Sequence, residues 1–549
     1  MRFLINKLFK LISGYFLVYF FIAQLYFFLA NLPLLINIIR TSKDTFFPLF
    51  HSANHYDYNM YLSVITQGAK GLWLAQDPYT SEITNPSLFY FFYILIGKMA
   101  ALFNLPSYIA YHIIRIISTE LFIMLLYVMN KTVLGVKIGF WASLFGIIAT
   151  ISPVFLFNQT GAFETFFLWW GGYEALKRLD NMPHYLFSFA CLFLIITLLV
   201  KYLNSKSVKY FLISLPIIFL SGIILPPSIL PILLTIPAAC YYLFMLNTRD
   251  RKRIIFSSND LLAFLILISV TLSPLLLIWR ENYNGFPWDT WNKWEIATWN
   301  LNEPNFNRAL VLLFGFLPVL SIPAIIKIIK SRDFTNIFII FWALMPYLFL
   351  PFVNLLGFSK MRLVSSSPFT PFAMIAAYSL FGTEFFVKKR FLQITTLTFF
   401  LLYSFYISGM QLYLQLKNEV VSPMYTSIFI PNTSWYGIYF LAKTAPKNSI
   451  VLSNEFIGSL IPAYSFTKTY FAHSVHTKDF QIKQGLVAKF YSNHMPEKEA
   501  YNFIKNNNIN YIYYGPDEMS LGDPPLSYTF LEKAYENKDV TVFKVKNNI

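Results

Sequence analysis

Apolar residues follow one another in long runs over the first three quarters of the chain, and short polar stretches separate these runs. A run of about 20 apolar residues is long enough for a helix to cross a bilayer. The pattern therefore predicts a polytopic α-helical membrane protein with about eleven spanning helices. The predicted spans cover residues 12–37, 107–129, 138–157, 184–202, 209–224, 227–246, 261–279, 309–329, 335–356, 367–383 and 391–412.

The apolar run at 88–103 is the exception. It is shorter than most of the others and has Lys98 near its middle, and a charge at the centre of a bilayer is costly. We therefore predict that 88–103 forms an interfacial or re-entrant helix within a first outer loop, residues 40–106.

The distribution of basic residues tests this topology. If 88–103 does not cross, basic residues far outnumber acidic ones in the loops on the N-terminal side, which is the pattern of cytoplasmic loops. The basic residues on that side are Arg2, Lys7, Lys10, Lys131, Lys137, Lys201, Lys206, Lys209, Arg249, Arg251, Lys252, Arg253, Lys327, Lys330, Arg332, Lys388, Lys389 and Arg390. The N-terminus is thus expected in the cytoplasm, with its apolar stretch kept as a signal anchor. The loop 40–106 and the C-terminal segment are expected outside.

The composition changes after about Leu412, and residues 413–549 are polar enough for a soluble domain. Alternating apolar residues predict strands at 449–453, 468–472, 510–514 and 540–545. Helices are predicted at 434–444, 479–491 and 496–507. We therefore expect two domains: a transmembrane catalytic region, 1–412, and a small extracytoplasmic α/β domain, 413–549.

The composition excludes several classes of function. Hydrophobic residues make up 56% of the chain and charged residues only 13%, about half the share of a typical soluble protein. The net charge of +16 lies in short loops between spans, so it orients the chain in a bilayer and does not indicate nucleic-acid binding. The two cysteines lie in apolar runs, which argues against a disulfide or metal site. Phosphate-binding loops and zinc-protease motifs are absent from the sequence.

The polar stretch that follows the first span contains the strongest catalytic candidate, Asp57. A carboxylate just outside the bilayer could act as general base and take a proton from an acceptor hydroxyl. The alternative is structural, since aspartate is also a good N-cap for a helix that starts near Tyr58. Spacing places Tyr61, Val64, Ile65 and Gly68 on one face of that helix, which could then lie on the bilayer surface. His51 and His55 in the same stretch could bind phosphate or a metal ion, or be ordinary loop histidines.

Arg362 is the second candidate, in the short outer turn FSKMR, with Lys360 two residues earlier. A guanidinium there could hold a phosphate through two hydrogen bonds and stabilise the charge on a leaving group. The alternative is a cation that contacts ordinary lipid headgroups.

Two further outer loops carry candidate residues. The loop 158–184 has Arg178, Asp180 and His184, which could complete a donor site or form a plain salt-bridged loop. The loop 281–308 has four tryptophans that could stack on sugar rings or form the aromatic belt of a membrane protein. These tryptophans are Trp288, Trp291, Trp294 and Trp299.

Four features in order carry a resemblance to a known family. They are the acidic first loop HYDYNMYLSVITQG, the segment DPYTSEITNPSLFYFFYILIGKMAALFNLPS, the turn FSKMR, and the C-terminal α/β segment. The chain resembles the GT-C superfamily, in particular the transferases related to protein O-mannosyltransferases and to the aminoarabinose transferases that act on lipid A. It differs from the mannosyltransferases in having Tyr58 after Asp57, where they typically have a paired Asp-Glu, and in lacking a large inserted luminal domain.

The resemblance implies a polyprenyl-phosphate sugar as donor, an essential first-loop acid (Asp57) and basic side chains that hold the lipid phosphate (Arg362). Asp77, Arg178 and His184 match the family more loosely. The two departures from the mannosyltransferases leave metal use and the class of acceptor open.

We therefore expect a glycosyltransferase of the plasma membrane that moves a sugar, with inversion, onto a hydroxyl of an envelope glycan, lipid or protein at the outer face. In this interpretation Asp57 is the base, and Arg362 and Lys360 hold the lipid phosphate, with Arg178. His55, Asp77 and His184 belong to the substrate site; metal and cofactor use stay open. The main alternative is a transporter or flippase for lipid-linked glycans, and a third is a non-catalytic relative that binds such glycans.

Overall fold

The structure is a computed structural model in which the chain forms two compact units, each assembled from segments far apart in sequence. The helical unit consists of residues 1–33, 115–278 and 295–422, and the α/β unit of residues 34–114, 279–294 and 423–549. The structure describes residues 14–51, 55–151, 172–249, 257–299, 313–330, 333–357, 359–366, 369–417, 420, 428–522 and 526–546.

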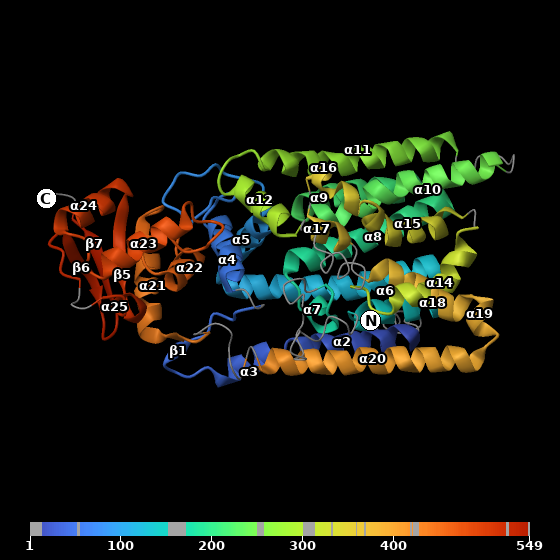
Figure 1. Cartoon of the computed structure of the whole chain (residues 1–549), viewed down its shortest axis with the longest axis horizontal. Coiled ribbons are helices and arrows are strands. Elements are labelled where there is room, and N and C mark those ends of the chain that lie inside the picture. Colours follow the sequence, from blue (N-terminus) through green and yellow to red (C-terminus); the bar gives the residue numbers. More distant parts are fainter. Residues whose placement is uncertain are drawn as a thin grey trace. The chain divides into compact units, whose positions relative to one another are not determined.

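Apolar helices form the helical unit, and Figure 1 shows that the longer ones lie along roughly the same axis. Its first helix, α2, is followed at a bend of 45° by α3 (Leu32–Arg40), most of which belongs to the α/β unit. The elements of the helical unit are α2 (Gly14–Ala30), α6 (Ser107–Ile148), α7 (Ala175–Leu179), α8 (Pro183–Ser205), α9 (Val208–Ile224), η2 (Pro226–Ile229), α10 (Leu230–Arg249), α11 (Ser258–Glu281), α14 (Leu317–Ile328), α15 (Phe334–Leu348), η3 (Leu350–Phe352), α16 (Val353–Leu356), α17 (Lys360–Val364), α18 (Thr370–Gly382), α19 (Glu384–Val387) and α20 (Arg390–Leu416).

Within the described residues, five helices are long and apolar enough to cross a membrane, and α2 with α3 would make a sixth. The helices α9, α14, α15 and α18 fall on predicted spans but have fewer than 18 residues each. Aromatic and aliphatic side chains of α2, α6, α8, α14, α15 and α18 form one continuous core. The architecture is therefore that of a multi-pass membrane protein, and the number of eleven spans stays a prediction.

Helix α6 is a hairpin of two antiparallel helices. Its backbone breaks at Gly135, which has φ +76° and ψ 175°. Across the break, Asn130 Nδ2 donates to Ser143 Oγ at 3.1 Å, whereas residues 13 apart in a straight helix are separated by about 20 Å. Close approach at the turn requires a second glycine, because a Cβ on Gly139 would lie 2.7 Å from the carbonyl oxygen of Asn130. The hairpin matches the predicted spans 107–129 and 138–157, of which 152–157 lie outside the described residues.

The α/β unit contains a five-stranded sheet in the order β4-β3-β5-β7-β6. Strand β3 pairs in parallel with β4 and β5, while β7 pairs antiparallel with β5 and β6. A separate antiparallel pair joins the first outer loop to the C-terminal segment. The strands are β1 (Thr45–Phe46), β2 (Ile430–Pro431), β3 (Ile450–Leu452), β4 (Lys468–Thr469), β5 (Ile509–Tyr514), β6 (Leu531–Glu536) and β7 (Thr541–Val545).

Helices cover both faces of this sheet, because side chains alternate along β5. Tyr511 and Tyr513 pack with α21 (Asn432–Thr444) and α22 (Glu455–Tyr464). Ile512 and Tyr514 pack with α23 (Phe480–Tyr491) and α24 (Glu497–Asn506). The short α25 (Pro516–Met519) follows β5. The four predicted strands and three predicted helices are each confirmed within a few residues, while α22 and β6 were not predicted. The predicted division at residue 412 stays a prediction.

The first outer loop forms two helices, α4 (His55–Ala69) and α5 (Phe91–Leu102), that cross at two glycines. A Cβ on Gly68 would lie 2.3 Å from the carbonyl oxygen of Ile94, and one on Gly97 would lie 2.1 Å from that of Ile65. Helix α4 also packs on α22, where Asn59 Nδ2 donates to Ser459 Oγ at 3.0 Å.

The face of α4 that carries Tyr61, Val64 and Ile65 is therefore buried inside the α/β unit. The expectation that this face lies on a bilayer is wrong, because α5 and α22 cover it. Helix α5 has 12 residues, too few to cross a bilayer. Its exposed end carries Met99, Leu102 and Phe103, which suits the predicted interfacial position.

Candidate active site

Asp57 lies in the first turn of α4, which begins two residues earlier at His55. The helix does not start near Tyr58, so the alternative interpretation of Asp57 as an N-cap is wrong. A carboxylate in the first turn is instead favoured by the unpaired backbone N–H groups at the helix start. Its side chain is 24% exposed, which leaves the carboxylate accessible from outside the protein.

Asp57 receives a hydrogen bond from a histidine that sequence reasoning missed. Nε2 of His473 lies 3.3 Å from Oδ1 of Asp57. The other ring nitrogen, Nδ1, accepts from the backbone N–H of Val475 at 3.2 Å. Because Nδ1 is an acceptor, the ring proton of the neutral imidazole is on Nε2 and is donated to Asp57. Burial lowers the pKa of His473, although the hydrogen bond to Asp57 opposes this shift, so the neutral form prevails near pH 7.

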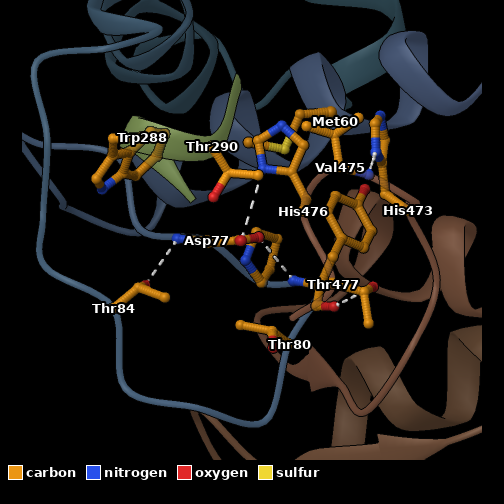
Figure 2. Close-up of polar contacts among 12 residues, drawn as sticks. Met60, Asp77, Thr80, Thr84, Trp288, Thr290, His473, Val475, His476 and Thr477 are labelled. Carbon is orange, nitrogen blue, oxygen red and sulfur yellow. Dashed lines mark hydrogen bonds and ion pairs between the residues drawn. The ribbon is translucent and has the colours of Figure 1, made fainter. Parts of the chain in front are cut away.

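A second carboxylate and histidine, Asp77 and His476, lie beside His473 (Figure 2). Asp77 is fully buried; its Oδ1 accepts from the N–H of Tyr79 at 2.9 Å. Its Oδ2 lies 3.6 Å from Nδ1 of His476. The rings of His473 and His476 are perpendicular, with centroids 4.7 Å apart. Asp57, His473, His476 and Asp77 thus form a continuous array inside the α/β unit.

The array rests on two loops bound to each other. One lies between α4 and α5 and carries Asp77, and the other follows β4. The loop after β4 carries both histidines, and the N–H groups of His476 and Thr477 donate to the carbonyl of His473 at 3.0 and 2.8 Å. Oγ1 of Thr477 donates in turn to the carbonyl of Tyr79 at 2.8 Å. Lys483 of α23 also binds the loop that carries Asp77, because its Nζ donates to Glu82 Oε2 at 2.8 Å. The only sequence signal for the two histidines is the spacing H-x-x-H directly after a predicted strand.

Two of the four tryptophans of loop 281–308 pack against this array from α12 (Trp288–Trp299). Their ring centroids lie 6.4 Å (Trp288) and 6.2 Å (Trp291) from that of His476. Nε1 of Trp288 donates to the carbonyl of Asn85 at 2.9 Å. The side chain of Trp294 is 37% exposed, and that of Trp299 lies outside the described residues.

Arg362 lies in the helical unit, in the short helix α17, which Ser359 caps. Its Nε and Nη2 donate to the two carboxylate oxygens of Glu295 at 2.8 and 3.1 Å. Its Nη1 contacts the hydroxyl of Tyr185, and Ser359 Oγ donates to Glu295 Oε1 at 2.6 Å. The guanidinium thus already holds an oxyanion through two hydrogen bonds, the geometry that a phosphate would use. Glu295 was not predicted.

His184 stands next to Tyr185 at the start of α8, with ring centroids 4.6 Å apart. The structure therefore brings His184 to the same part of the helical unit as Arg362. Lys360, two residues before Arg362, is largely buried. His55 is also buried and packs against the rings of Tyr56 and Phe456.

Arg178 has a different environment from the other candidates. Its side chain is 2% exposed and donates to the carbonyls of Gly146, Ile147 and Ala149 at 2.7–2.9 Å, at the end of α6. Nε donates to the carbonyl of Gly172 at 2.8 Å. These bonds satisfy helix-end carbonyls, which is a structural task. Asp180 forms a buried ion pair with Arg115, as in the alternative of a salt-bridged loop.

The described residues contain no group of three or more histidine, cysteine, aspartate or glutamate side chains that could hold a metal ion. No sequence family and no curated protein matches the chain.

Solved structures do match. The aminoarabinose transferase ArnT from Cupriavidus metallidurans, bound to undecaprenyl phosphate, superposes with a TM-score of 0.54 over 96% of this chain and 98% of that chain, at 10% identity. This chain has the GT-C fold. The arabinofuranosyltransferase AftD from Mycobacteria matches with a TM-score of 0.50 at 12% identity, over 96% of this chain and 42% of that chain. The oligosaccharyltransferase from Archaeoglobus fulgidus matches with a TM-score of 0.48 at 12% identity, over 90% and 69% of the two chains.

The predicted resemblance to the GT-C superfamily is thereby confirmed at the level of fold. At identities this low, the GT-C fold places helices and strands but assigns no residue a role. The roles of Asp57, Arg362, Lys360, His184, His55 and Asp77 stay predictions, and so does the substrate role of Arg178.

Proposed function

We propose that this protein is a glycosyltransferase that takes a sugar from a polyprenyl-phosphate donor and attaches it to a hydroxyl group at the outer face of the plasma membrane. The acceptor is an envelope glycan, lipid or protein. The observation that carries the proposal is the partly exposed Asp57 carboxylate, held by a neutral histidine in a chain with the GT-C fold.

In the proposed reaction the acceptor oxygen attacks the anomeric carbon of the sugar. The bond from that carbon to the phosphate oxygen breaks, and the lipid phosphate leaves with the bonding electron pair. The acceptor proton passes to Asp57, which acts as general base. One direct displacement of this kind inverts the anomeric configuration. A lipid-linked donor suits a site outside the cytoplasm, where nucleotide sugars are not supplied.

Arg362 holds the phosphate of the donor in this proposal, with Lys360 and His184. Its fork already binds the carboxylate of Glu295, and a phosphate can accept the same two parallel N–H bonds through two of its oxygens. Charge developing on the leaving phosphate would strengthen the contact between Arg362 and that phosphate in the transition state. Because Glu295 occupies the same fork, a bound phosphate has to displace or share it.

The proposal assigns places to Asp77 and His55 as well. Asp77 would support the substrate site through His476. His55 would line the acceptor side of Asp57, from the same first turn of α4. Arg178 is left with its structural task at the end of α6.

The test uses the purified full chain in detergent, with a panel of undecaprenyl-phosphate sugars and an envelope extract as acceptor. Mass spectrometry should find a new glycosidic product and free undecaprenyl phosphate in equal amounts. Detergent removes any vectorial movement, so a flippase would give neither product. If no donor in the panel is consumed although the folded protein binds undecaprenyl phosphate, the proposed transfer is wrong.

A further inference from the structure

The C-terminal segment contributes a side chain to the reacting group of the first outer loop. His473 follows β4, whereas Asp57 lies in α4, and both belong to the α/β unit. We propose that His473 is a positioning residue, which holds the Asp57 carboxylate in the orientation that receives the proton of the acceptor. This inference rests on the proposed function and deepens it.

The hydrogen-bond pattern gives the His473 ring a fixed direction. The N–H of Val475 donates to Nδ1 at 3.2 Å, so Nε2 carries the proton and points to Asp57 Oδ1 at 3.3 Å. A ring flip would place a C–H group against the carboxylate and break the hydrogen bonds to both Asp57 and Val475. Figure 2 shows the Val475 contact on the ring of His473.

Packing keeps the ring from turning. His473 is 6% exposed, and the rings of Tyr56, Tyr79 and His476 surround it at centroid distances of 6.1, 6.1 and 4.7 Å. The carbonyl of His473 accepts two N–H groups of its own loop. Orientation errors of about 1 Å in a catalytic group can cost on the order of 100-fold in rate, so this rigidity is valuable at Asp57.

The difference in exposure assigns the two roles. The Asp57 side chain is 24% exposed, whereas His473 is 6% exposed. An acceptor hydroxyl can therefore approach the carboxylate but not the imidazole. Nδ1 is engaged with the backbone, so the ring has no acceptor atom that could take the acceptor proton while Nε2 donates to Asp57. His473 thus acts through Asp57, and it differs in this from a catalytic base.

The experiment compares three substitutions of His473 in the full chain with undecaprenyl-phosphate sugars as donor. His473→Gln can still donate an N–H from its side-chain amide. His473→Phe keeps the ring but has no donor, and His473→Met matches glutamine in length without an N–H. The control is His494→Phe at an exposed position of the same unit.

We expect His473→Phe and His473→Met to lower kcat by about 100-fold with the KM of the donor and the binding of undecaprenyl phosphate unchanged. His473→Gln should retain activity within about tenfold of the wild type, and His494→Phe should match the wild type. A purely structural role would lower folded yield and all activities together, without rescue by glutamine. If His473→Phe does not fold, the comparison of His473→Met with His473→Gln decides the same question.

Two results distinguish a failure of the positioning role from a failure of the proposed function. If Asp57→Asn is inactive while the folded His473→Phe and His473→Met variants keep wild-type kcat, His473 is not a positioning residue and the proposed function stands. If the wild-type chain transfers no sugar, the proposed function fails and the positioning role fails with it.

Discussion

Nε2 of His473 donates to Oδ1 of Asp57 at 3.3 Å, although 416 positions separate the two residues in sequence. The contact joins the first turn of α4 to the loop after β4. It adds to the packing of α4 on α22 and the β1–β2 pair, which also join the first outer loop to the C-terminal segment in one compact unit. The carboxylate proposed as base therefore depends on the folding of the last part of the chain.

The glycine crossing of α4 and α5 should be intolerant of side chains. Gly68→Ala and Gly97→Ala place a Cβ 2.3 and 2.1 Å from backbone oxygens, so the helices must separate. We expect each substitution to destabilise the protein by about 2–3 kcal/mol, measured by thermal unfolding in detergent. Gly485→Ala in the interior of α23 is the control, because its Cβ would meet nothing within 4 Å. Equal unfolding temperatures for all three variants would contradict the close crossing.

Arg178 should matter for folding and not specifically for substrate binding. Arg178→Met leaves the carbonyls at the end of α6 without their donors, and each buried group left unpaired costs about 1–3 kcal/mol. We expect a sharp loss of folded protein in size-exclusion chromatography. The exposed Arg280→Met is the matched control. A folded Arg178→Met variant that selectively loses binding of undecaprenyl phosphate would contradict this expectation and support the predicted substrate role.

Glu295 and phosphate should compete for Arg362. Glu295→Gln removes the opposing charge, so undecaprenyl phosphate should bind about three- to tenfold more tightly, as isothermal titration in detergent can measure. Arg362→Gln should weaken binding by at least about tenfold, and Arg362→Lys should recover only part of it, because lysine lacks the fork. Lys293→Gln removes an exposed cation of α12, the helix that carries Glu295, and should leave the binding of undecaprenyl phosphate unchanged. Unchanged binding in the folded Arg362→Gln and Glu295→Gln variants would exclude Arg362 as the phosphate site.

Acid should destabilise the α/β unit through His55. Burial lowers the pKa of His55 from 6.5 to about 4, so the folded state binds its proton more weakly than the unfolded state does. Stability is therefore full above pH 6.5 and decreases as the pH falls toward 4, by up to about 3 kcal/mol for this group.

His55→Phe keeps the aromatic contacts with Tyr56 and Phe456 and removes the titration. The unfolding temperature of this variant should fall less between pH 7 and pH 4.5 than that of the wild type. An equal fall in both proteins would show that His55 is not the group responsible.

Periodicity in the sequence predicts much of the fold, because burial on one or all sides leaves a regular pattern. The apolar runs predict the long helices, and alternation predicts β3, β5 and β7. Helix α22 escapes prediction because EFIGSLIPAY contains Gly458 and Pro462, which normally interrupt helices. Strand β6, LEKAYE, escapes because an exposed edge strand has little apolar alternation.

The candidate site is predicted only in part. Asp57 and Arg362 are visible because charged residues beside long apolar runs are unusual. Their partners, His473 and Glu295, are not visible, since each contact depends on tertiary structure that local patterns do not encode. Arg178 shows the same difficulty, because a cation that caps a helix and one that binds phosphate look alike in sequence.

The most direct test of the account is the rate of sugar transfer from undecaprenyl-phosphate donors by Asp57→Asn, beside the wild type and the exposed-acid control Asp44→Asn. The account predicts that Asp57→Asn folds and binds undecaprenyl phosphate normally, but transfers sugar at least about 100-fold more slowly, while Asp44→Asn retains wild-type activity. Full transfer by folded Asp57→Asn would contradict it.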